Sequence, residues 1–144
     1  MADIVILYDS LRGNTGRLTA ALEEILTAAG HQVKTFKPKE IDLDAVAAAD
    51  CLLIGGPTYH KGLIKTMEPV LFQLEKLDLK GKPGAAFASF GWSGESLGII
   101  EDTMKNLYGI DLLVPGIKVK QTPVAAKVKK EIEPFAAAII EALK

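Results

Sequence analysis

A short loop near the amino terminus contains the residue types that bind phosphate. An apolar run at residues 4–8 leads into hydroxyl, amide and glycine residues, and a helical pattern begins directly after them. The first N–H groups of a helix have no partner within the helix, and the helix dipole favours negative charge there. The sequence therefore predicts a phosphate-binding loop made of Ser10, Leu11, Arg12, Gly13, Asn14 and Thr15.

Two further loops carry aromatic residues at the ends of apolar runs. One follows residues 51–55, and the other follows residues 85–89. Ligands of open α/β sheets bind beyond the carboxyl ends of the strands, so a phosphate-binding loop beside two aromatic loops suits a flat ring with a phosphate tail. The candidate binding residues are Pro57, Thr58, Tyr59, His60 and Gly62 in the first loop, and Ser89, Phe90, Gly91, Trp92 and Gly94 in the second.

Alternating strand and helix patterns place these loops along the chain. Continuous apolar runs at 4–8, 51–55 and 85–89 are typical of parallel strands buried on both faces. Two more strands are predicted at 31–36 and at 117–120, where strict alternation after Pro115 and Gly116 indicates a sheet edge with one solvated face. Five strands alternating with helices predict an α/β fold, with a parallel sheet covered by helices on both faces.

The helices are predicted from apolar residues at helical spacing. They are expected at 15–29, 43–49, 67–74, 97–107 and 128–143. Gly30 is a stop signal after the first helix, Pro69 is expected in or near the first turn of its helix, and Pro134 lies inside the last. The helix at 97–107 is expected to present one apolar face, formed by Leu97, Ile100, Met104 and Leu107.

Composition limits the class of protein. The chain has 144 residues, 49% of them hydrophobic, which predicts one domain over residues 1–144. A net charge of −1 argues against nucleic acid as the main partner, and the lysines at 118, 120, 127, 129 and 130 are interpreted as a solvated strand edge and helix face. No signal pattern or bilayer-spanning run is found, and the lone cysteine, Cys51, is expected to be buried, so we expect a cytoplasmic protein.

Together the three loops resemble those of the flavodoxin family. Residues 10–15 are similar to the flavodoxin phosphate loop, and residues 55–59 and 89–94 resemble the flavodoxin-like FMN domain of A-type flavoproteins, also called flavodiiron proteins. The resemblance covers nearly the whole chain. It implies a flavodoxin-like, doubly wound, five-stranded parallel sheet in the order 2-1-3-4-5, with FMN bound where the strand order reverses, as it is in flavodoxin.

The resemblance also implies roles for individual residues. The loop at 10–15 would wrap the FMN phosphate, the segment 57–59 would run along the ring edge, and Trp92 would stack on the ring. Trp92 as a core residue and Tyr59 as a surface residue are the alternatives. Arg12 departs from the family pattern, which has threonine there. Its guanidinium either pairs with the phosphate, or it projects into solvent while its N–H binds.

The function implied is that of a short-chain, FMN-binding electron-transfer protein. It would shuttle electrons between redox partner proteins, a reductase and an acceptor, without a catalytic acid or base and as a monomer or weak dimer. The alternative is an FMN-dependent NAD(P)H:quinone or metal reductase, which needs a substrate pocket that these short loops do not favour. A flavin-free receiver module is disfavoured because Asp9 is the only acid at the end of the first strand, and no metal-site spacing is found.

Charge near the ring allows one further expectation. Reduced flavin tends toward an anion, so surrounding carboxylates lower its reduction potential. Asp9 and Glu95 are the acids of the three loops, against Arg12, Lys61 and, when protonated, His60. We therefore expect the second reduction step to be less suppressed than in a flavodoxin whose ring is surrounded by acids.

Overall fold

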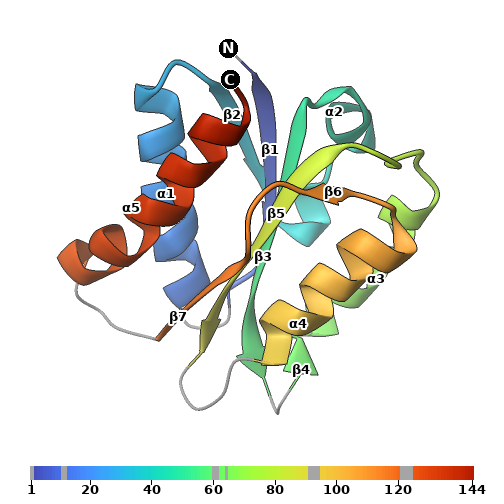
Figure 1. The fold of residues 1–144 in the computed structure, drawn as a ribbon. Coiled ribbons are helices and arrows are strands. Elements are labelled where there is room, and N and C mark those ends of the chain that lie inside the picture. The colour runs from blue at the N-terminus through green and yellow to red at the C-terminus, as the bar shows by residue number, and fades with distance from the viewer. Residues whose placement is uncertain (1, 11–12, 60–61, 64, 91–94, 121–124) are drawn as a thin grey trace.

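A parallel sheet forms the middle layer of the molecule, with helices on both faces (Figure 1). The computed structural model describes residues 2–10, 13–59, 62–63, 65–90, 95–120 and 125–144. Across the sheet the strands are β2 (Gln32–Phe36), β1 (Asp3–Tyr8), β3 (Cys51–Tyr59), β5 (Pro83–Phe90) and β6 (Asp111–Leu112), and β7 (Ile117–Lys120) also pairs with β5. β6 pairs with the first residues of β5 and β7 with the last, so together they form one interrupted fifth strand. The predicted order 2-1-3-4-5 is confirmed.

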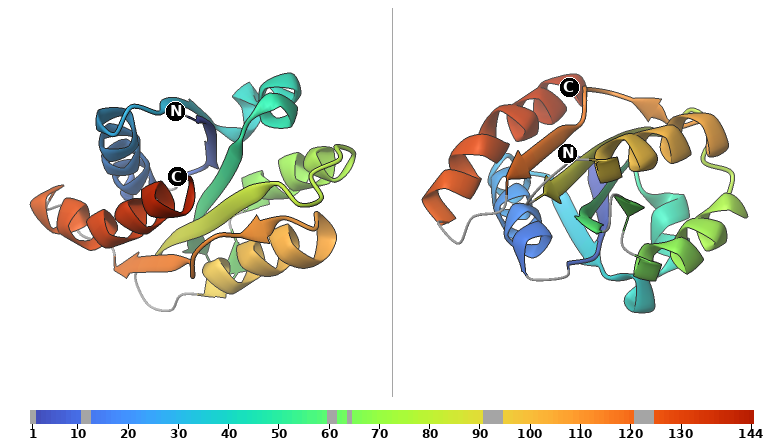
Figure 2. Two further views of the ribbon diagram at one scale, coloured as in Figure 1. Left: turned by 45° about the horizontal axis from the view of Figure 1, so that its top comes forward. Right: turned by 90° about the horizontal axis from the view of Figure 1, so that it is seen from below.

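Two groups of helices cover the two faces of the sheet (Figure 2). One face carries α1 (Asn14–Ala28) and α5 (Ala125–Ala142), and the other carries α2 (Leu43–Ala48), α3 (Glu68–Glu75) and α4 (Glu95–Asp102). Short helical turns occur at η1 (Pro38–Glu40), η2 (Lys65–Met67) and η3 (Thr103–Leu107), the last with π geometry. Pro69 lies in the first turn of α3 and Pro134 lies within α5, as predicted.

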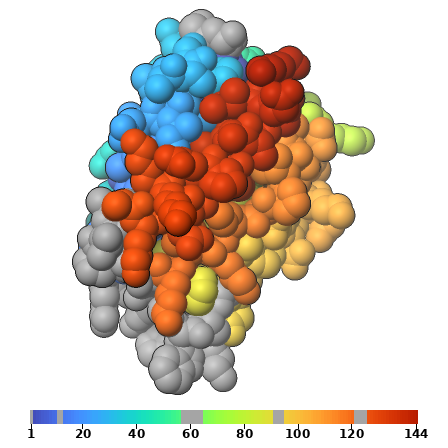
Figure 3. All heavy atoms as spheres, turned by 60° about the vertical axis from the view of Figure 1, so that its left-hand side comes forward, coloured from blue at the N-terminus to red at the C-terminus, as the bar shows by residue number. Residues whose placement is uncertain are grey.

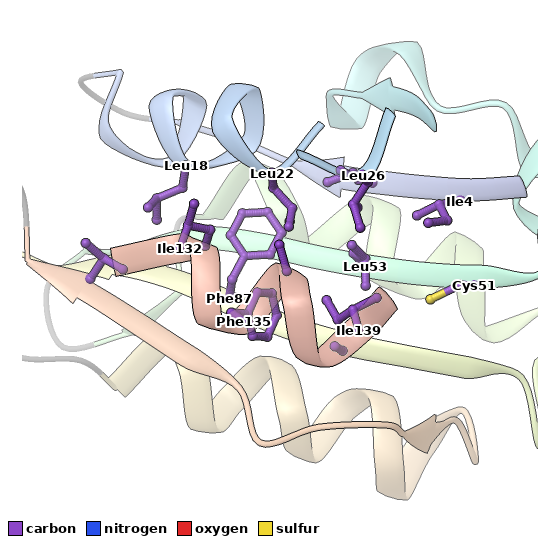
Figure 4. Close-up of a cluster of buried hydrophobic side chains, with 14 of the residues drawn as sticks. Ile4, Leu18, Leu22, Leu26, Cys51, Leu53, Phe87, Ile132, Phe135 and Ile139 are labelled. Atoms are coloured by element: carbon purple, nitrogen blue, oxygen red, sulfur yellow. The ribbon is translucent and has the colours of Figure 1, made fainter. Parts of the chain in front are cut away.

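The face under α1 and α5 is packed with apolar side chains (Figure 4). Phe87 of β5 is fully buried, and its ring centroid lies 6.5 Å from that of Phe135 in α5. The Phe87 ring also passes over Gly55 of the neighbouring strand, where an added Cβ would lie 2.2 Å from ring atoms. Gly55 is therefore needed here for close approach. Cys51 lies in this cluster, and burial raises the pKa of its thiol to about 12.

The face under α3 and α4 departs from the prediction at one end. Ile100 and Met104 are buried as expected, but Leu107 is 51% exposed, so its predicted burial is wrong. The reason is the π geometry of η3, in which the N–H of Tyr108 bonds to the carbonyl of Thr103, five residues earlier. The wider turn takes Leu107 out of the helical phase that the sequence pattern assumes.

A second difference concerns the segment 56–59, which was predicted to be loop. β3 continues through it to Tyr59 and forms an antiparallel pair with β4 (Gly62–Leu63), in which Thr58 opposes Leu63. β4 lies directly after β3 in the chain. Its pairing lets β3 extend beyond Gly55, the last residue of β3 that pairs with β1. Within the described residues, no helix is both long and apolar enough to span a bilayer.

Candidate functional site

The carboxyl ends of β1, β3 and β5 meet at one edge of the sheet, the lower edge in Figure 1. The amino ends of α1 and α4 lie at the same edge because each helix follows one of these strands. Residues that the sequence analysis assigned to separate loops are therefore brought together here, as ligand sites in open α/β sheets require.

The segment between β1 and α1 is held by side-chain hydrogen bonds. The Asp9 carboxylate accepts from the Ser10 N–H at 2.8 Å and also from the Thr66 hydroxyl, which ties the loop to η2. The Ser10 Oγ in turn accepts from the N–H of Gly16 at 3.2 Å. A hydroxyl that accepts in this way keeps its own hydrogen for donation to a ligand.

The start of α1 presents backbone donors. Gly13 precedes the helix with a φ of 84° and provides no side-chain cap, and the first turn contains no acidic residue. Within the described part of the chain, the N–H groups of Gly13, Asn14 and Thr15 have no acceptor. Unpaired among the described residues, these donors lie at the positive end of a 15-residue helix, which favours an anion there. That the FMN phosphate binds them stays a prediction.

Thr15 and Ser89 form a buried link between two of the predicted loops. Their hydroxyl oxygens lie 2.7 Å apart, and both residues are almost fully buried although they are 74 positions apart in the chain. The Thr15 side chain therefore joins α1 to the end of β5. Its hydroxyl is used in this contact, so Thr15 would bind an anion through its backbone N–H. Both residues were predicted to be binding residues, but this contact between them was not predicted.

Arg17 is a second cation near this loop, where the sequence pattern pointed to Arg12 alone. Its side chain turns back along the first turn of α1, and Nη1 donates to the Asn14 Oδ1 at 3.3 Å. The same nitrogen lies 3.4 Å from where a Cβ of Gly13 would be. Spacing could have indicated Arg17, because it lies three residues after Asn14 and four after Gly13, and residues at these spacings share one helix face.

Comparison with known proteins identifies the family. A family model described as flavodoxin matches residues 6–135, which is most of the chain. The chain belongs to the flavodoxin family. Among its relatives, the rubredoxin-oxygen oxidoreductase of Megalodesulfovibrio gigas is 30% identical over 145 residues, covering 98% of this chain and 36% of that protein. The type A flavoprotein fprA of Rhodobacter capsulatus is 30% identical over 138 residues, covering 88% of this chain and 30% of that protein.

Solved structures agree with this assignment. Flavodoxin 2 from Bacillus cereus superimposes with a TM-score of 0.88 at 28% identity, covering 97% of this chain and 99% of the other. The rubredoxin oxygen:oxidoreductase from Desulfovibrio gigas gives a TM-score of 0.82 at 28% identity, covering 98% of this chain and 37% of that one. The chain thus spans about a third of the length of the A-type flavoproteins it matches and nearly all of a flavodoxin.

FMN is the cofactor of this flavodoxin-family chain, and the described residues fit it. The phosphate is a dianion, and the start of α1 offers it unpaired N–H groups, the Ser10 hydroxyl and the Arg17 guanidinium. Of the ring-side residues, Phe90 is half-buried at the end of β5, and the Lys118 Nζ lies 5.9 Å from its ring centroid.

Several predicted binding residues lie outside the described part. They are Leu11, Arg12, His60, Gly91, Trp92 and Gly94, and for Pro57, Thr58, Tyr59 and Gly62 only the backbone is described. Their proposed contacts with FMN stay predictions. Within the described residues, no group of three or more His, Cys, Asp or Glu side chains is placed to hold a metal ion.

Proposed function

We propose that this chain is a short-chain electron carrier in which FMN is held by its phosphate at the start of α1. The proposal rests mainly on the N–H groups at the start of α1, which are unpaired among the described residues. The Arg17 guanidinium and the Ser10 hydroxyl beside them add to it. The protein's part is to bind and orient the flavin and to tune its potential, while the flavin supplies the electron-transfer chemistry.

The phosphate contacts are divided between backbone and side chains. The N–H groups of Gly13, Asn14 and Thr15 hold the phosphate oxygens, Ser10 donates its hydroxyl hydrogen, and Arg17 supplies the compensating charge. Leu11 and Arg12, which lie outside the described residues, are proposed to bind in the same loop, Arg12 either through its guanidinium or through its N–H. The segments 57–62 and 89–94 contact the ring, with Trp92 stacked on it.

Redox partner proteins are proposed as electron donor and acceptor. The relative from Megalodesulfovibrio gigas is named for rubredoxin and oxygen, but this chain covers only 36% of that protein, so we assign this chain the flavin step alone. The two apolar clusters on a single sheet support one FMN-binding domain over residues 1–144, and the buried Cys51 thiol suits the cytoplasmic location that the sequence predicts.

Reconstitution and stepwise reduction test the proposal. The purified chain is mixed with FMN or with riboflavin, which lacks the phosphate, and binding is followed by flavin fluorescence. The bound flavin is then reduced in steps while its visible spectrum is recorded. Tight FMN binding, weak riboflavin binding and a one-electron-reduced flavin during the titration are expected. Steady NADH turnover without a partner protein would instead support the reductase, and failure to bind FMN would contradict the proposal.

A further inference from the structure

Exposed lysines gather where β7 leads into α5. Lys118 and Lys120 on β7 and Lys127 and Lys130 on α5 are all exposed, and we call these four residues the lysine surface. Their neighbour Lys129 pairs with Glu24 at 3.4 Å. Within the described residues, the other ion pair joins Lys144 to Glu141, so none of the four lysines has a carboxylate partner there.

The lysine surface follows from the local folding of β7. Ile117 and Val119 point toward the α5 side and pack in the core, so the two lysines between and after them project from the opposite side of the strand. Lysines on an edge strand also prevent edge-to-edge pairing of sheets. That function needs no charge on α5, where Lys127 and Lys130 are exposed as well.

The lysine surface lies beside the proposed flavin site. Lys120 is the Cα partner of Phe90, the last described residue before the segment 91–94, and the Lys118 Nζ lies 5.9 Å from the Phe90 ring. Arg17 of the proposed phosphate site lines a groove between α1 and α5 together with Lys129 and its partner Glu24. β7 and α5 contact each other and come forward on the side of the molecule seen in Figure 3.

The opposite edge of the sheet carries acidic residues. Four exposed aspartates lie at or before the amino ends of strands, namely Asp3, Asp50, Asp78 and Asp111. The charges of Lys80 and Lys82 partly offset those of the four aspartates. In the same way, Glu95 and Glu131 partly offset the charge of the lysine surface. The exposed lysines of β7 and these four aspartates therefore lie at opposite edges of the sheet.

We propose that the lysine surface docks an electron-transfer protein whose own redox centre is bordered by carboxylates. Complementary charge raises the rate of encounter and orients the partner, which here would turn it toward the flavin end of the sheet. This inference rests on the proposed FMN function. It goes beyond that function by specifying the charge of the partner and where it approaches.

Small redox ions of opposite charge test the local field. The FMN-loaded protein is reduced, and its reoxidation by ferricyanide or by hexaamminecobalt(III) is followed by stopped flow. Each ion accepts one electron, taking iron(III) to iron(II) or cobalt(III) to cobalt(II), while the flavin loses that electron. In Lys118→Gln/Lys120→Gln at low ionic strength, we expect the ferricyanide rate constant to fall about 3- to 10-fold and the hexaamminecobalt rate constant to rise. Both changes should largely disappear at about 0.5 M salt, where screening is strong.

Two matched variants separate position from net charge. Lys80→Gln/Lys105→Gln removes the same two charges from exposed sites away from the flavin edge and is expected to change either rate constant by less than about 1.5-fold. Lys118→Arg/Lys120→Arg keeps the charge and should keep the rates of the parent protein. Equal effects of the 118/120 and 80/105 glutamine variants would overturn the proposal.

A binding measurement gives a readout independent of electron transfer. Hexaglutamate is titrated into the ¹⁵N-labelled protein, and amide shifts are expected to concentrate on β7 and the first half of α5. The shifts should be lost in Lys118→Gln/Lys120→Gln. Shifts spread evenly over the surface, or none at all, would overturn the docking surface. A chain that binds hexaglutamate at β7 but takes up no FMN would instead contradict the proposed function.

Discussion

The two faces of the sheet differ in how completely they are covered. On the face under α1 and α5, regular helices bury their apolar residues, and none of the large exposed apolar side chains of the described chain lies there. All three such residues lie on the other face. Phe72 of α3 is 67% exposed, Ile99 of α4 39%, and Leu107 of η3 51%. Apolar residues at helical spacing are therefore buried only where the helix keeps α geometry and another element packs against that face.

The same two faces differ in their relation to the site. The side-chain hydroxyl of Ser89 points to the α1 side, where it meets Thr15, and Ser10 and Arg17 also bond within the first turn of α1. The residues proposed to bind the phosphate thus lie on the densely packed face. A site on rigid elements keeps its donors in position without a ligand, which lowers the ordering that binding requires.

Matched truncations of two phenylalanines would give the largest contrast between the faces. Phe87→Ala removes a fully buried ring and is expected to lower the free energy of unfolding by about 3–5 kcal/mol. Phe72→Ala removes an exposed ring and should change it by less than about 0.5 kcal/mol. Urea denaturation followed by circular dichroism measures both. Equal losses for the two variants would contradict the difference in burial.

Replacement of Arg17 tests whether the packed face holds the phosphate. Arg17→Gln is expected to weaken FMN binding about 10- to 100-fold, because a hydrogen bond to a charged group contributes about 1.5–3 kcal/mol. Riboflavin affinity should not change, since riboflavin has no phosphate. Fluorescence titration measures both ligands, and Arg17→Lys, which keeps the charge, should recover part of the loss. An equal loss for FMN and riboflavin would show that Arg17 acts on the fold rather than on the phosphate.

Removal of the buried hydroxyl pair gives a smaller effect on the same face. Ser89→Ala leaves the Thr15 hydroxyl buried without its partner and is expected to destabilise the protein by about 1–2 kcal/mol. The double variant Thr15→Val/Ser89→Ala should lose less than the sum of the single losses, because the two residues share one bond. Thermal and urea unfolding provide the four free energies of this cycle. Strict additivity would contradict a direct Thr15–Ser89 bond.

Substitution in the π turn gives the smallest expected effect. Leu107→Gln places a polar group at a half-exposed position and should change the free energy of unfolding by less than about 0.5 kcal/mol. Met104→Gln, one turn earlier and fully buried, is the control and should be strongly destabilising. If Leu107→Gln destabilised the protein as much as Met104→Gln, the helix would keep α phase through residue 107 in solution.

Much of the fold was readable from the sequence because its signals are local. Apolar runs located β1, β3 and β5, Gly30 marked the end of α1 with a φ of 95°, and alternation in β7 separated its buried residues from its lysines. The start of α1 directly after the hydroxyl and glycine residues of the predicted phosphate loop was also readable, whereas phosphate binding there stays a prediction.

Contacts between distant residues were decided by the tertiary structure. The Thr15–Ser89 bond joins residues 74 positions apart, and the Phe87 ring over Gly55 depends on the register of two strands. Local signals did not reveal the extension of β3 to its pairing with β4, because a strand ends only where its partners end.

The sequence by itself therefore determined the order of strands and helices along the chain and the buried cysteine. Only the tertiary structure decided that Arg17 turns back to Asn14, that Leu107 faces solvent and that Lys120 lies opposite Phe90. The physical reason is that propensity and periodicity act within a few residues, whereas hydrogen-bond partners, helix phase and surface charge are set by which elements the fold brings together.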